Sequence, residues 1–166
     1  MKHLCPITGV SARMVVAVIA SLAAAGCTSG PSIRGNYVLD YRQLPDGKQV
    51  RPPDVMGMMT FTKDHRNFNV YWQQDGKPAS ISVISKYSIN ETKFTEENIY
   101  SVTNGVDGKG PTYDTSHTSG QSPVSVNGDK LQFKLPLHDE PKVTFDEHGF
   151  TAVRPGAFVD HWKRVH

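Results

Sequence analysis

Methionine and histidine side chains offer this chain its most specific chemistry, which is metal binding. Met56, Met58 and Met59 carry thioethers, soft ligands that suit Cu(I). In an extended strand, however, Met59 points away from the other two, and no cysteine or nearby histidine completes a site. Six histidines follow residue 27, and no pair of them has His-x-His or His-x-x-x-His spacing. We therefore expect no metal ion and no cofactor.

Enzymatic chemistry would need motifs that the sequence lacks. No Gly-x-Ser-x-Gly segment marks a nucleophilic serine, and no glycine-rich loop precedes a helix that would bind phosphate. The best catalytic alternative is His117, acting as an acid or a base beside a bound substrate. Because a full set of nucleophile, base and orienting group is not apparent, we expect that the protein is not an enzyme.

The residues that lead to Cys27 have the order of a secretory signal. Lys2 and Arg13 precede about twelve nearly unbroken apolar positions, and small residues at 24–26 stand directly before Cys27. As a helix, this run would span only about 18 Å, which is short of the ~30 Å hydrocarbon core of a bilayer. The pattern therefore predicts an exported protein rather than one with a transmembrane anchor.

Cys27 is the candidate lipidation site. The segment Ala24-Ala25-Gly26-Cys27 resembles the lipobox of bacterial lipoproteins, although Ala24 stands where leucine is usual. The resemblance implies cleavage before Cys27 and attachment of acyl chains such as palmitate to it. Thr28 follows, and the absence of aspartate there resembles the sorting rule for the outer membrane, on the periplasmic side of a Gram-negative cell. The alternative is an ordinary cleaved signal with a chance cysteine.

Composition sets the size and charge of what remains. The predicted parts are a signal peptide (1–26), a lipidated tether (27–34) and one domain (35–166). Removal of the signal takes away two basic residues, so 16 basic residues (18 − 2) balance 16 acidic ones. No basic stripe remains for nucleic acid, and we exclude nucleic acid as a partner.

Beyond the tether, the apolar residues follow a period of two. Phe68, Val70 and Trp72 alternate with polar neighbours, for example, and Asp-Gly or Asn-Gly turns at 46–47, 75–76 and 127–128 separate such segments. We therefore expect an all-β fold, an antiparallel up-and-down β-barrel of about eight to ten strands. Residues 104–123, rich in Gly, Ser and Thr, form a long loop and a candidate lid.

Five short segments follow one another along the chain: Gly35-Asn36-Tyr37, the turn Asp46-Gly47-Lys48, Met59-Thr60-Phe61-Thr62, the segment VNGDKL at 126–131, and Trp162-Lys163-Arg164. In this order and spacing, residues 34–165 resemble the bacterial lipocalin-like domains. The resemblance implies a lipocalin-like barrel in which an aromatic residue closes one end beneath a basic side chain. Tyr37 stands where that family has tryptophan, and its expected partners at this end are Trp162 and either Arg164 or Arg154.

The interior decides what such a barrel does, because eight to ten strands either pack solid or leave room for one small ligand. The small residues Gly57 and Ser85 lie in phase with the inward face and would leave space. The side chains expected to line the interior and contact a ligand are Tyr41, Met59, Phe61, Phe68, Val70, Trp72, Ile81, Val83, Phe133 and Phe145.

These patterns predict a membrane-anchored lipoprotein that binds or carries a small apolar or amphipathic ligand. The membrane is the expected partner, through the lipid anchor. The alternative is a non-catalytic interaction or structural module with a filled barrel, whose partner is another protein of the cell envelope.

Overall fold

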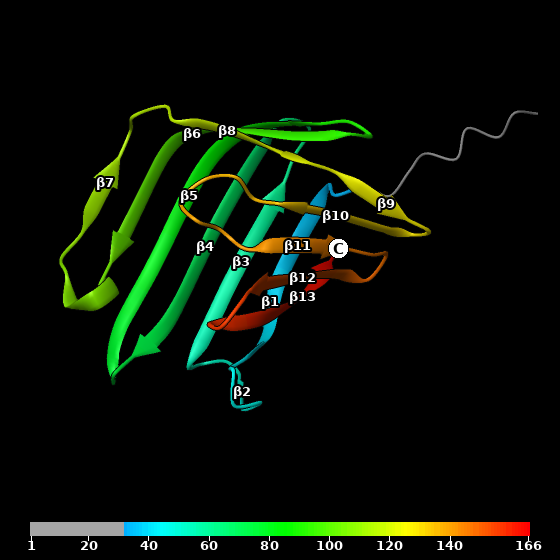
Figure 1. Ribbon diagram of the computed structural model, residues 1–166. Coiled ribbons are helices and arrows are strands. Elements are labelled where there is room, and N and C mark those ends of the chain that lie inside the picture. The colour runs from blue at the N-terminus through cyan, green and yellow to red at the C-terminus, as the bar shows by residue number, and fades with distance from the viewer. Residues whose placement is uncertain (1–31) are drawn as a thin grey trace, which may run out of the picture.

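The computed structural model describes residues 32–166 (Figure 1). The predicted signal peptide and Cys27 lie outside these residues. Within them, the chain forms one antiparallel sheet of 13 strands and a short 3-10 helix, η1 (Val106–Gly108). The strands are β1 (Gly35–Gln43), β2 (Gln49–Val50), β3 (Val55–Phe61), β4 (His65–Gln74), β5 (Lys77–Ile89), β6 (Lys93–Asn104), β7 (Thr112–Asp114), β8 (Ser119–Pro123), β9 (Ser125–Asn127), β10 (Lys130–Lys134), β11 (Lys142–Phe145), β12 (Gly149–Arg154) and β13 (Phe158–Val165).

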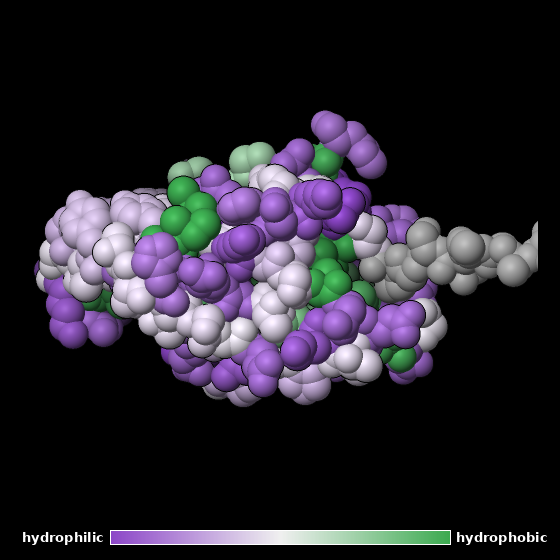
Figure 2. All heavy atoms as spheres, turned by 90° about the horizontal axis from the view of Figure 1, so that it is seen from above, coloured by the Kyte–Doolittle hydropathy of each residue, from purple (hydrophilic) through white to green (hydrophobic). Residues whose placement is uncertain are grey.

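These strands follow the two-residue period of the sequence, with apolar side chains on the inner face of the sheet. In β4 and β5, for example, Phe68 pairs with Val83 and Val70 pairs with Ile81, and all four side chains share one face of the sheet. Met59 is buried while Met56 and Met58 are exposed, as the alternation predicts. The all-β, antiparallel prediction is confirmed. Hydrophilic residues cover most of the face seen in Figure 2, with hydrophobic residues in small separate patches.

The sheet is strongly curved, but the predicted closure into a barrel is wrong. The strand order runs from β7 and β6 at one edge to β10 and β9 at the other, and within residues 32–166 no ladder joins the two edges. Instead β8 pairs with β6, while β9, which follows it directly, pairs with β10. The two edges meet through side chains: the Ser122 hydroxyl donates to the carbonyl of Lys134, and Gly120 lies against Pro136. Because proline has no N–H group, Pro136 cannot extend a ladder there.

Aromatic side chains fill the interior at the end of the molecule where Ser32, the first described residue, lies. Tyr37 is fully buried and makes edge contacts with Phe145 and Phe150, at ring distances of 5.7 and 5.1 Å. Its hydroxyl donates to the carbonyl of Ile33 at 2.8 Å. Of the two arginines considered for this end, Arg164 lies over the Tyr37 ring, 5.1 Å from its centre.

The Arg164 guanidinium also donates to the carbonyls of Arg34 and Ser32, so it fixes the start of the described chain to this end. Trp162 is buried beside it and stacks on Phe150 at 5.3 Å. The indole of Trp162 lies so close to Gly57 that a Cβ there would be 2.7 Å from it. The space expected at Gly57 is therefore filled by Trp162 rather than left for a ligand.

A β-bulge in β1 overturns the expected orientation of Tyr41. Leu39 pairs with Trp162, but Tyr41 pairs with His161, so Asp40 is an extra residue in β1. After it, the residues that would point inward point outward, and the reverse. Tyr41 consequently stacks on His161 on the outer face, at a ring distance of 4.2 Å, and Arg42 takes the inward position. Alternation alone could not show this change of face.

Buried Tyr37 predicts a specific alkaline response. Burial raises its pKa from 10.0 to about 12, against the lowering effect of Arg164. A raised folded-state pKa contributes stability that is present below pH 10 and is lost as the pH rises toward 12. Tyr37→Phe should therefore flatten the fall in unfolding free energy over this range, measured by urea denaturation. Tyr113→Phe, at a residue 65% exposed, should not. Equal slopes for the wild type and Tyr37→Phe would contradict the burial of this phenol.

Candidate functional site

The interior is hollow at the end opposite Ser32. A cavity of about 240 Å³ lies between β4, β5 and β6 on one side and the segment 138–141 with the β12–β13 turn on the other. Five of the ten predicted ligand-contacting residues line it: Phe68, Val70, Trp72, Ile81 and Val83. Four others, Met59, Phe61, Phe133 and Phe145, are buried in the aromatic core. Tyr41, on the outer face, is not part of the lining.

The apolar wall of the cavity comes from paired strands. Trp72 pairs with Ala79, Val70 with Ile81, and Phe68 with Val83, which stacks the inward side chains in three rows. Phe68 also reaches Trp162, 6.0 Å between ring centres, so the wall is continuous with the aromatic core. This wall can bury one apolar group of a ligand.

A polar strip lies next to this wall, on the inward face of β6. Ser101 and Thr103 line the cavity, and they pair with Val83 and Ile81 of the apolar wall. Further along the same face lie Asn98 and Glu96, both buried; a bulge at Ile84/Ser85 keeps them in phase with Ser101. The cavity therefore has an apolar side and a hydroxyl-bearing side.

Arg42 forms part of the rim and is already paired. Its Nε and Nη2 donate to the two carboxylate oxygens of Asp160 at 2.6 and 2.8 Å. The guanidinium lies 4.0 Å from the ring centre of Phe158 and 5.8 Å from that of Trp72. Burial raises the pKa of Asp160, and the hydrogen bonds from Arg42 oppose that rise. Elsewhere on the rim, Arg154 donates to Asp139 at 2.9 Å.

A buried ion network lies beneath the cavity. The fully buried Arg66 donates through Nε to Glu96 at 2.6 Å and through Nη2 to Glu140 at 2.9 Å. Ser85, expected to leave space, donates to Glu96 and is part of this network. Arg66 Nη1 and Glu96 Oε2 are buried without a hydrogen-bond partner.

Two carboxylates therefore share one guanidinium. Burial raises the pKa of Glu140, more than Arg66 lowers it. For Arg66, burial alone would lower the pKa, but Glu140 and Glu96 outweigh that effect and raise it. The network carries one more negative than positive group when all three are ionised.

Sequence reasoning missed the charged members of this site. The polar composition of residues 63–67 (KDHRN) predicts a turn, yet β4 begins at His65, and Arg66 lies on the same face as Phe68 and Val70. Asp160 likewise lies in phase with buried Trp162. The signal that could have found them is a charged residue at an inward position of a strand.

The other sequence candidates lie elsewhere. His117 is 62% exposed, 3.3 Å from Glu97, and does not line the cavity. Of the predicted lid 104–123, only Val106 lines it, because β7 and β8 pair with β6; the segment 138–141 covers the cavity instead. Among residues 32–166, no group of three or more His, Cys, Asp or Glu side chains is arranged to hold a metal ion. In the same residues, no helix has the length and apolar character needed to cross a membrane.

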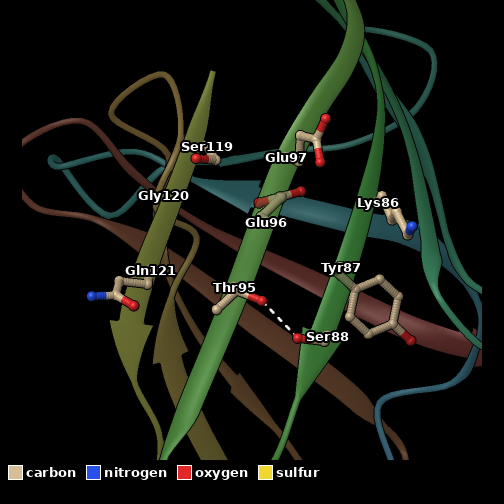
Figure 3. Close-up of a pocket in the computed structure, with 9 residues that line it drawn as sticks. All are labelled: Lys86, Tyr87, Ser88, Thr95, Glu96, Glu97, Ser119, Gly120 and Gln121. Atoms are coloured by element: carbon tan, nitrogen blue, oxygen red, sulfur yellow. Dashed lines mark hydrogen bonds between the residues drawn. The ribbon is translucent and has the colours of Figure 1, made fainter. Parts of the chain in front are cut away.

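Two further hollows are open to solvent, and polar atoms form a larger share of their lining than in the 240 Å³ cavity. A groove of about 550 Å³ over β5, β6 and β8 is lined by polar side chains such as Lys86, Glu97 and Gln121, and a hydrogen bond joins Ser88 and Thr95 in it (Figure 3). A hollow of about 920 Å³ near Ser32 is bordered by turn residues that include Lys63 and Glu91. The second hollow also has apolar side chains in its lining, among them Ile33, Ile89 and Leu131, but both hollows are more open to solvent than the 240 Å³ cavity, and small-molecule sites are mostly enclosed.

The buried network predicts an asymmetric mutational response. Arg66→Met should cost about 3–5 kcal/mol of unfolding free energy in urea, because it leaves carboxylates buried without a counterion. Adding Glu96→Leu should recover part of that loss. Arg154→Met removes a half-exposed pair and should cost less than about 1 kcal/mol. Equal losses at Arg66 and Arg154 would contradict the assigned burial.

No model of a known protein family matches this chain, and neither a curated protein nor a solved structure matches it. The resemblance to the bacterial lipocalin-like domains therefore stays a prediction. The cavity is the feature that points to a function: it combines an apolar wall from β4 and β5, hydroxyl groups on β6 and a rim of ion pairs.

Proposed function

We propose that this protein is an outer-membrane lipoprotein, anchored through Cys27, that binds or carries a small apolar or amphipathic molecule in the 240 Å³ cavity. The observation that carries the proposal is the placement of Phe68, Trp72 and Ile81 around an enclosed space at one end of the molecule. The alternation of apolar residues in the sequence alone predicts that all three contact a ligand.

The cavity limits the ligand in size and in kind. A cavity of about 150 Å³ holds one benzene ring, so about 240 Å³ suits one ring with substituents or a short alkyl chain. The apolar wall favours burial of that part of the ligand, at roughly 25 cal/mol per Å² removed from water. Ser101 and Thr103 can hydrogen-bond a polar group on the opposite side.

The proposed anchor also determines which end of the molecule faces the membrane. Five residue steps separate Cys27 from Ser32, a reach of at most about 18 Å. Ser32 lies at the aromatic-filled end, where Arg164 binds its carbonyl, and the cavity lies at the other end. An anchored molecule would therefore hold its cavity away from the membrane surface, accessible to ligands in the periplasm.

A competing hypothesis is the interaction module without a ligand, acting on another envelope protein. It is favoured by the filled half of the interior, where Met59, Phe61, Phe133 and Phe145 pack with Tyr37. Ligand titration separates the two hypotheses, because the interaction module needs no access to the cavity.

Filling the cavity should abolish binding. Ile81→Trp places an indole in the space, while Ile84→Trp, on the outer face of the same strand and at a residue 40% exposed, is the matched control. With 1-hexanol as the probe and NMR titration as the measurement, we expect Ile81→Trp to weaken binding at least about tenfold. Ile84→Trp should bind as the wild type does. Failure of the wild type to bind, or equal binding by Ile81→Trp, would favour the interaction module.

Loss of the thiol should prevent anchoring. Cys27→Ala, expressed as the full chain, should stall processing or release a soluble protein, because no acyl chain can be attached. Membrane fractionation and labelling with radioactive palmitate measure this, with Cys5→Ala, at a cysteine within the predicted signal, as the control. Unchanged fractionation and labelling of Cys27→Ala would remove the lipoprotein proposal.

A further inference from the structure

We infer that the cavity selects small amphipathic cations: ligands with an apolar body of about six to eight heavy atoms and a protonated amine that binds the carboxylate of Glu140. This inference rests on the proposed ligand-binding function, and it adds the charge of the ligand. It follows from the charge balance, the hydrogen-bonding capacity and the geometry of the groups around the cavity.

The Arg66 network has one carboxylate more than it has guanidinium groups. Around and beneath the cavity, three guanidinium groups and four carboxylates form ion pairs: Arg42 with Asp160, Arg154 with Asp139, and Arg66 with both Glu96 and Glu140. The first two pairs are each neutral. The excess negative charge therefore belongs to the Arg66 network, and Glu140 is its member that lines the cavity.

Other ionisable groups near the rim do not cancel that charge. Lys134 lies 3.6 Å from Asp139, not from Glu140, and its side chain is mostly exposed to solvent. His138 is 3.9 Å from Asp114, which carries a negative charge of its own. Glu140 is largely removed from water and burial raises its pKa, so an ammonium group beside it would stabilise the ionised carboxylate that its surroundings disfavour.

Glu140 offers the cavity one carboxylate oxygen that accepts no hydrogen bond. In the described residues, the hydrogen bond from Arg66 reaches Oε1 of Glu140, and no donor reaches its other oxygen. The buried atoms of residues 32–166 that have no partner belong to residues that do not line the cavity: the acceptors Glu96 Oε2 and Asn98 Oδ1, the donors Arg66 Nη1, Trp162 Nε1 and Arg164 Nε, and His161 Nε2. An ammonium group has three N–H donors and no acceptor, so it complements this oxygen of Glu140, whereas a carboxylate has only acceptors.

The arginines at the rim do not make a site for an anion. Two nitrogens of Arg42 are engaged by both oxygens of Asp160, and the guanidinium is stacked on Phe158. Arg154 is half-exposed and bound to Asp139. An anionic ligand would have to displace one of these carboxylates and would then lie beside Glu140, with like-charge repulsion.

The geometry lets one molecule use both sides. The apolar wall formed by Phe68, Trp72 and Ile81 lines the same 240 Å³ space as Glu140. A six-carbon chain on the wall thus places its amine within the cavity that Glu140 borders. The aromatic faces of this wall also favour a nearby cation.

Three probes that differ only in their polar group test the inference: hexylamine, 1-hexanol and sodium hexanoate, titrated by NMR at pH 7 and low salt. We expect hexylamine to bind the wild type about tenfold more tightly than 1-hexanol, and hexanoate to bind more weakly than both. Glu140→Gln should remove the advantage of hexylamine, so that the ratio of its affinity to that of 1-hexanol falls to about one. Glu147→Gln, at an exposed turn, is the control and should change neither.

Each outcome is decisive. If hexanol or hexanoate binds the wild type as tightly as hexylamine, or if Glu140→Gln keeps the preference for the amine, the inference is wrong while the proposed function stands. If none of the three probes binds, the proposed ligand-binding function falls and the inference falls with it.

Discussion

The buried guanidinium of Arg66 is the interaction on which the organisation of the interior depends. It extends from β4 and binds Glu96 on β6 and Glu140 in the segment between β10 and β11, which are distant in the sequence. All of these groups are largely removed from water, so any one of them alone would carry a penalty of several kcal/mol. The three parts of the chain therefore keep their positions only together, and one wall of the cavity is among them.

The division of the interior into a filled and a hollow end follows from side-chain size. Toward Ser32, the inward residues of neighbouring strands are aromatic, and Tyr37, Phe145 and Phe150 pack edge to face. Toward the other end, the inward residues of β6 are Ser101 and Thr103, which leave the space that the aromatic rings fill elsewhere. Packing density in protein interiors is high, and here the small side chains of β6 face the large Phe68 and Trp72 across a volume that no other side chain fills.

The alternation of apolar residues was enough to predict most of the strands, their antiparallel hairpins and five of the residues that line the cavity, because burial of one face is a local property. Three features were not local. Asp40 is an extra residue opposite β13, which turned Tyr41 outward and Arg42 inward. The sequence around Arg66 predicts a turn, because a charged residue is not expected on the buried face of a strand. Its burial depends on Glu96 and Glu140, which are distant in the sequence. Closure of the sheet depended on whether β8 would pair with β10, and pairing with β6 was preferred.

The unclosed seam explains why a loop rather than a strand borders the cavity. The loop after β10 contains Pro136 and Pro141, which cannot donate to a ladder, and the N–H of Leu135 instead donates across its base to the carbonyl of Pro141 at 3.1 Å. His138 and Asp139 both have left-handed backbones, φ 51° and 52°, at a cost of about 1–2 kcal/mol for each non-glycine residue. The same segment carries the ion pairs of Asp139 with Arg154 and of Glu140 with Arg66. Because backbone strain and ion pairing fall on the same few residues, a change in the charge at Glu140 acts directly on the shape of the cavity wall.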